Sequence, residues 1–161
     1  MRLRSLLVFV SLLALPFVAQ AERMGVQRIG VLNAELIRLR TAVGIHDRGA
    51  ADVARFFVAQ GATVRRAHVK DVPNGRKARI DLRRMGRMDL VAISATMRQS
   101  RQTVGELVDY LTRHGIPANR IVIGGRAIQR AHADALGVRW AAGPGPVLAR
   151  IMRQAAAAAK R

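Results

Sequence analysis

The chain has 161 residues, half of them hydrophobic, which suits one domain with a sizeable buried core. It contains no cysteine, so a disulfide framework and thiolate metal or redox chemistry are excluded. The formal net charge of +18 favours anionic partners, while an aromatic content of 4% argues against a nucleic-acid partner held by base stacking.

The N-terminal segment has the pattern of an export signal. Two arginines give it a positive start, residues 6–18 form an apolar run, and a small-x-small cleavage site ends at Ala21. The apolar run is shorter than the roughly 20 residues of a comfortable membrane span. We therefore expect a signal peptide over 1–21, a single domain over 22–161, no stable membrane span after cleavage, and a periplasmic or secreted protein. Translation from Met24 is the alternative, and it implies a cytoplasmic protein.

Beyond the signal, short apolar runs alternate with helical stripes, which is typical of βα units. Residues 37–43 alternate apolar and polar side chains and lead directly into a histidine-bearing turn, so we expect the first strand there. Residues 28–32 are the alternative first strand. The stripe of Val53, Phe56 and Phe57 then predicts a helix over 50–60.

The later elements follow from the same two periodicities. Helix 103–114 has the clearest pattern, with apolar residues at i, i+3, i+4 and i+7. The other expected elements are strands over 63–69, 90–94, 120–123 and 138–142, a turn over 71–75, and helices over 76–87, over 128–136 and from Pro146 onward. Residues 155–161 form a basic low-complexity tail that we expect to fray. Five strands alternating with helices predict an α/β fold: a flavodoxin-like (Rossmann-like) doubly wound, five-stranded parallel sheet in three layers.

Three turns with unusual residues follow predicted strands. One carries His46, one is the pair Gly124-Gly125, and one is Gly143-Pro144-Gly145. In an open α/β sheet the carboxyl ends of the strands form one rim, where ligands bind. A histidine and two glycine-rich turns on one rim suggest a large flat ligand with a coordinating atom.

These turns resemble the cobalamin-binding domain of methylmalonyl-CoA mutase and related corrinoid proteins. The resemblance spans residues 39–152 and is carried, in order, by His46-Asp47-Arg48-Gly49, Ser94, Gly124-Gly125 and Gly143-Pro144-Gly145. The family signature is D-x-H-x-x-G, then S-x-L, then a G-G pair, each at a strand end. It implies a cobalamin cofactor, adenosylcobalamin in the mutase branch. Because a (β/α)₈ catalytic barrel needs about 250 residues, mutase (isomerase) catalysis would need a separate catalytic subunit.

The resemblance also implies a role for each residue. His46 would be the metal ligand, placing a neutral imidazole below the cobalt. Ser94 would hydrogen-bond the buried base of the displaced nucleotide tail, and Gly124 and Gly125, lacking Cβ atoms, would leave room for that tail. The other expected cofactor-binding residues are Asp47, Arg48, Gly49, Thr96, Gly143 and Gly145.

Two positions depart from the family pattern. Gly44 replaces the aspartate that orients the imidazole, and losing such a partner lowers metal affinity by about 10- to 100-fold. Thr96 replaces the leucine of S-x-L. These departures favour a second hypothesis, an exported or envelope-associated interaction protein that keeps the fold and has lost the cofactor. A third is an anion or nucleic-acid binder that uses the arginine-rich helix 76–87.

No catalytic grouping is readable in the sequence. There is no Ser-His-Asp pattern, P-loop or paired carboxylate. His114 falls in the last turn of a predicted helix, which indicates a structural role. His68 and His132 lack neighbours at ligand spacing, so we assign no second metal.

Overall fold

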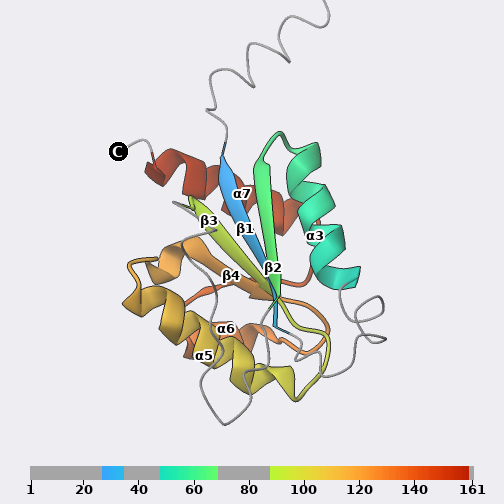
Figure 1. Ribbon diagram of the computed structural model, residues 1–161, viewed down its shortest axis with the longest axis vertical. Coiled ribbons are helices and arrows are strands. Elements are labelled where there is room, and N and C mark those ends of the chain that lie inside the picture. Colours follow the sequence, from blue (N-terminus) through green and yellow to red (C-terminus); the bar gives the residue numbers. More distant parts are fainter. Residues whose placement is uncertain (1–26, 35–47, 69–87, 160–161) are drawn as a thin grey trace, which may run out of the picture.

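The computed structural model describes residues 27–34, 48–68 and 88–159 (Figure 1). The expected turn over 71–75 and helix over 76–87 lie outside these ranges, as does the expected signal peptide. The elements in chain order are β1 (Arg28–Asn33), α3 (Arg48–Ala59), β2 (Thr63–His68), β3 (Leu90–Ser94), α5 (Ser100–Arg113), the 3₁₀ helix η2 (Ala118–Arg120), β4 (Ile121–Gly124), α6 (Arg130–Ala135), β5 (Arg139–Ala141) and α7 (Pro146–Ala159).

The five strands form one parallel sheet in the order β2-β1-β3-β4-β5. This is the flavodoxin-like order, with its topological switch point between β1 and β3, and it confirms the predicted fold class. The strands end together, since Asn33 pairs with Ser94, Ser94 with Gly124, and Gly124 with Ala141. We call this end of the sheet the carboxyl edge.

Helices cover both faces of the sheet (Figure 1). Strand β3 shows how the sequence divides between the faces. Val91 and Ile93 pack in the cluster with α5 and α6, whereas Leu90 and Ala92 pack with α3 and α7. Because side chains alternate along a strand, Ser94 belongs to the α3/α7 face.

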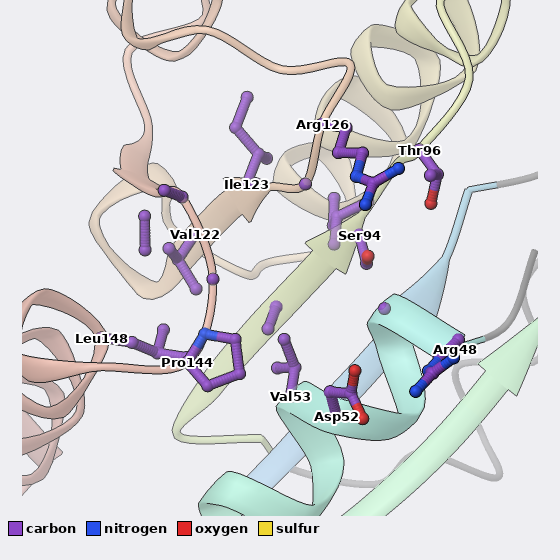
Figure 2. A pocket seen from close by; sticks show the side chains of 18 of the residues that line it. Arg48, Asp52, Val53, Ser94, Thr96, Val122, Ile123, Arg126, Pro144 and Leu148 are labelled. Carbon is purple, nitrogen blue, oxygen red and sulfur yellow. The ribbon is translucent and has the colours of Figure 1, made fainter.

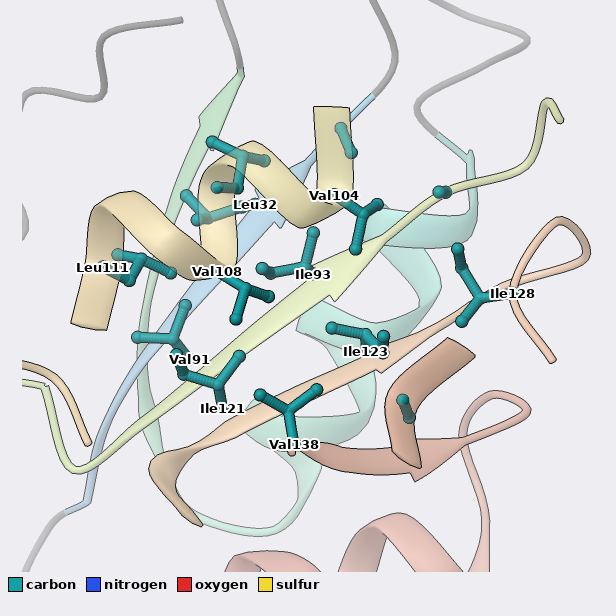
Figure 3. Packing of buried hydrophobic residues seen from close by; sticks show 14 of the residues in the cluster. Leu32, Val91, Ile93, Val104, Val108, Leu111, Ile121, Ile123, Ile128 and Val138 are labelled. Atoms are coloured by element: carbon teal, nitrogen blue, oxygen red, sulfur yellow. The ribbon is translucent and has the colours of Figure 1, made fainter. Parts of the chain in front are cut away.

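The cluster under α5 is the larger part of the core. Figure 3 shows Val104, Val108 and Leu111 of α5 over Ile93 and the neighbouring strand residues. Leu111 and Val104 are almost completely buried, at 0% and 1% exposure. This is the apolar stripe from which the helix was predicted, and burial of each such side chain contributes about 1.5–3 kcal/mol to stability.

The preferred first strand is wrong, and the alternative is correct. Strand β1 is Arg28–Asn33, and all of its residues after Arg28 are buried. A central strand of a parallel sheet is covered on both faces, so it has a continuous apolar run and no alternation. The alternating segment 37–43 lies outside the described residues.

Helix α3 begins at Arg48 and buries a narrower stripe than expected. Phe57 is completely buried, but Val53 and Phe56 are only partly so. The remaining buried residues of the helix are the alanines Ala50 and Ala54. Small residues therefore face the sheet along the first half of α3.

The expected fraying of the tail is also wrong as far as Ala159. Helix α7 continues through the alanine run, and Ala155 and Ala156 are only 1% and 8% exposed. Alanine has the highest helix propensity, and its small side chain lets α7 lie close to the sheet. No helix within the described ranges combines the length and the apolar character needed to cross a membrane.

Candidate functional site

A pocket of about 710 Å³ opens at the carboxyl edge between α3 and α7 (Figure 2). It is lined by the first turns of α3, the ends of β3, β4 and β5, the turns that follow these strands, and Leu148 of α7. Its volume lies in the range of small-molecule sites, about 300–1,000 Å³. Its place beside the β1/β3 switch point is where doubly wound folds bind ligands.

Small side chains create this pocket. Towards the carboxyl edge, the α3/α7 face of the sheet presents Ala92 and Ser94 from β3, Gly124 from β4 and Ala141 from β5, and all four line the pocket. Isoleucine or leucine at these positions would fill the space between the two helices. The sequence therefore encodes the pocket through residue size at the strand ends.

Ser94 lies at the buried side of the pocket. Its side chain is 7% exposed, and within the described ranges no residue hydrogen-bonds to its hydroxyl, which is open to the pocket. A Cβ on Gly49 would come within 3.0 Å of Ser94 Oγ and 3.8 Å of Thr96 Oγ1. Glycine at position 49 thus lets the first turn of α3 approach both hydroxyls.

The paired glycines line the pocket, but the fold itself explains them. A Cβ on Gly124 would lie 2.0 Å from the carbonyl oxygen of Ala141, in the neighbouring strand. Gly125 has a φ of +102°, and a Cβ there would lie 2.3 Å from the carbonyl oxygen of Ala95. Backbone packing requires both glycines before any ligand is considered, and the further role of leaving room for a nucleotide tail stays a prediction.

The last glycine-rich turn contributes one glycine to the pocket. Gly143 is a lining residue, and a Cβ there would meet no atom within 4 Å. Gly145 is not among the lining residues, and its carbonyl accepts a hydrogen bond of 3.0 Å from the Ala149 N–H at the start of α7. Gly143 is therefore the glycine at which a larger side chain would enter the pocket without disturbing the chain.

The structure thus brings together every expected site residue that it describes, except Gly145. Arg48 and Gly49 come from α3, Ser94 and Thr96 from the end of β3 and the turn after it, and the remaining glycines from the next two strand ends. His46 and Asp47 lie outside the described residues, as does Gly44. The expected metal ligand is therefore untested by the geometry.

Charged residues also line the pocket. Asp52 of α3 forms an ion pair with Arg55. Arg48 and Arg126 are exposed lining residues, and neither forms an ion pair with any residue in the described ranges. Sequence reasoning missed Arg126, although it directly follows the paired glycines on the predicted rim. The two arginines make the mouth of the pocket cationic.

The two other histidines with described side chains have local roles. Nδ1 of His114, at the C-terminal end of α5, lies 2.7 Å from the Tyr110 carbonyl oxygen. Nδ1 of His132 accepts a hydrogen bond of 3.2 Å from the Gln129 N–H and caps α6. Within the described ranges, no three histidine or acidic residues lie close enough together to hold a metal ion.

No protein-family model matches this chain, and no curated protein is similar to it in sequence. Among solved structures, the fold is similar to that of a novel cobalamin-binding protein from Desulfitobacterium hafniense DCB-2, with a TM-score of 0.54 and 20% sequence identity. The match covers 77% of this chain and 55% of the other, so this chain spans little more than half the length of that protein. At this level of identity the similarity establishes a shared fold.

Proposed function

We propose that this protein is a corrinoid-binding module that holds cobalamin at the carboxyl edge of its sheet. The observation that carries the proposal is the pocket between α3 and α7. Residues assigned to cofactor binding from separate stretches of sequence line this one cavity. The cobalamin-binding protein of similar fold gives independent support.

The pocket suits the nucleotide tail of cobalamin, which ends in a flat aromatic base. Except for Val122, the strand residues of this face that line the pocket are small, so a flat group has room between α3 and α7. Ser94 is a buried residue whose hydroxyl is open to the pocket, so the hydroxyl is placed to donate a hydrogen bond to a ring nitrogen of that base. When bound, cobalamin supplies a cobalt centre that makes and breaks bonds to carbon.

His46 is the proposed lower ligand of the cobalt. It precedes Arg48 by two residues, and peptide geometry limits the distance between their Cα atoms to roughly 7 Å. Arg48 itself lines the pocket. With Gly44 in place of the family aspartate, the imidazole lacks one orienting partner, and we expect metal affinity about 10- to 100-fold below that of a site with the carboxylate.

We also propose that the module carries the cofactor for a separate catalytic subunit, with adenosylcobalamin as the form suggested by the mutase resemblance. The second candidate function is an exported interaction protein without cofactor. One observation favours this candidate: Gly124 and Gly125 are required by backbone packing, so they would persist after cofactor binding was lost.

The test is a titration of the purified protein with hydroxocobalamin, followed by gel filtration. We expect the corrinoid to elute with the protein and its visible spectrum to change on binding. The His46→Ala variant is expected to bind more weakly and to give a different spectrum. His114→Ala is the matched control, because this exposed histidine lies at the end of α5. A wild-type protein that elutes free of corrinoid would support the cofactor-free candidate.

A further inference from the structure

We infer that the mouth of the pocket contains a subsite for a phosphate group, formed by Arg48 and Arg126. The inference rests on the proposed function for the identity of the ligand, and it assigns one part of that ligand to Arg48, which the resemblance left without a specific role, and to Arg126, which lies outside the family signature. Both arginines line the pocket, and within the described part of the chain neither has an ion-pair partner. No described carboxylate therefore lies within ion-pair distance of either guanidinium.

The surroundings of the arginines strengthen this assignment. In the view of Figure 2, the Arg126 side chain extends from the turn after β4 towards the side of the pocket that holds Ser94 and Thr96, while Arg48 lies on the first turn of α3. The start of α3 adds the positive end of a 12-residue helix. The acidic lining residue Asp52 opposes anion binding, but its carboxylate is paired with Arg55.

The order of groups in the ligand matches the order of groups in the pocket. In cobalamin the nucleotide tail runs from the corrin through a phosphodiester and a ribose to the base. Ser94 is 7% exposed and is placed for the base, whereas Arg48 and Arg126 are exposed at the mouth. The phosphodiester is the charged group between the corrin and the base, so it falls beside the arginines. Arginine suits this role because its guanidinium donates paired hydrogen bonds to phosphate oxygens.

The experiment compares two corrinoids on matched variants. Cobalamin carries the phosphodiester, while dicyanocobinamide has the corrin but lacks phosphate, ribose and base. We expect Arg126→Gln to raise the Kd for cobalamin by about tenfold and to leave the Kd for cobinamide unchanged. Arg48→Gln is expected to act in the same direction, and Arg126→Lys to retain part of the affinity. Arg153→Gln is the control, because Arg153 is an exposed residue of α7 outside the pocket lining.

A titration with inorganic pyrophosphate separates this inference from the proposed function. Equal cobalamin affinity in the wild type and both glutamine variants would overturn the phosphate subsite and leave corrinoid binding intact. If the wild type binds neither corrinoid but binds pyrophosphate, and the double variant Arg48→Gln/Arg126→Gln does not, the subsite stands and the corrinoid assignment is lost. A wild-type protein that binds neither of the two corrinoids and does not bind pyrophosphate would overturn both the phosphate subsite and the proposed function. Circular dichroism of each variant checks that the fold is retained.

Discussion

Replacing Gly124 by alanine tests the packing of the carboxyl edge directly. The new Cβ would lie 2.0 Å from the carbonyl oxygen of Ala141, less than two-thirds of an ordinary carbon–oxygen contact of about 3.3 Å. The carbonyl oxygen belongs to the backbone of β5, and the backbone of β4 fixes the position of the new Cβ, so no side-chain rotation can relieve the contact. Strand β4 must separate from β5 by about 1 Å to relieve the contact.

The size of the effect follows from that separation. Overpacking in a close-packed region destabilises by about 1–3 kcal/mol. The β4/β5 ladder is short, pairing only Val122, Ile123 and Gly124 with residues of β5, and weakening one of its hydrogen bonds removes about 1 kcal/mol more. We expect Gly124→Ala to lower the free energy of unfolding by about 3 kcal/mol, which corresponds to a Tm lower by roughly 6–12 °C for a domain of this size.

The assay is urea unfolding without ligand, followed by the fluorescence of the single tryptophan, Trp140. Gly143→Ala is the matched control, since a Cβ there would meet no atom within 4 Å, and its stability is expected within about 0.5 kcal/mol of wild type. If the two variants unfold at the same urea concentration, the packing explanation of the paired glycines is wrong. Leaving room for a ligand would then be the better explanation for glycine at these positions.

The remaining predictions concern α3, α7 and the N-terminus. Gly49→Ala brings a Cβ against Ser94 Oγ, and this contact opposes the gain in helix propensity from replacing a glycine of α3. The substitution should therefore be less favourable by about 1 kcal/mol in the wild type than in the Ser94→Ala background, and a double-mutant cycle with no coupling would contradict this. Ala155→Glu should lower the free energy of unfolding by more than about 3 kcal/mol because it buries a carboxylate. Ala157→Glu, at an exposed position, should leave the midpoint of thermal unfolding unchanged. Equal midpoints for the two variants would mean that residues 155–159 fray as the sequence predicted. If the signal peptide is cleaved as proposed, mass spectrometry of the exported protein should give Glu22 as its first residue, and an uncleaved start would argue for the cytoplasmic alternative.

Elements with strong local patterns were predictable from the sequence. The bounds predicted for β3 are those observed, because its apolar run is bordered by polar residues, and the stripe of α5 gave that helix to within three residues at its start. The first strand was misplaced in the prediction because residues 37–43 alternate apolar and polar side chains, as a strand buried on one face does. Strand β1 is instead buried on both faces, and that burial follows from its central place in the sheet. The buried end of α7 depends on how closely the helix lies to the sheet, and local composition does not reveal that distance.

The candidate site was likewise predictable only in part. The strand-end positions of Ser94 and the glycines followed from the topology of a parallel sheet, and these residues line one pocket, with Gly145 as the exception. The reason for glycine at 124 and 125 could not be predicted, since the opposing atoms belong to backbone far away in the sequence. Arg126 was missed because one arginine among many carries no signal until the structure shows that it lines a cavity without an ion-pair partner in the described residues.

The most direct test of the central proposal is the electron paramagnetic resonance spectrum of protein loaded with cob(II)alamin, grown with ¹⁵N-labelled histidine. The unpaired electron on the cobalt couples to the nitrogen of the lower ligand, and the number of lines reports the isotope of that nitrogen. Ligation by His46 predicts the two-line splitting of ¹⁵N, which should disappear in His46→Ala. A three-line splitting from unlabelled nitrogen, meaning that the cofactor keeps its own base on the metal, would contradict the account, as would a protein that takes up no corrinoid.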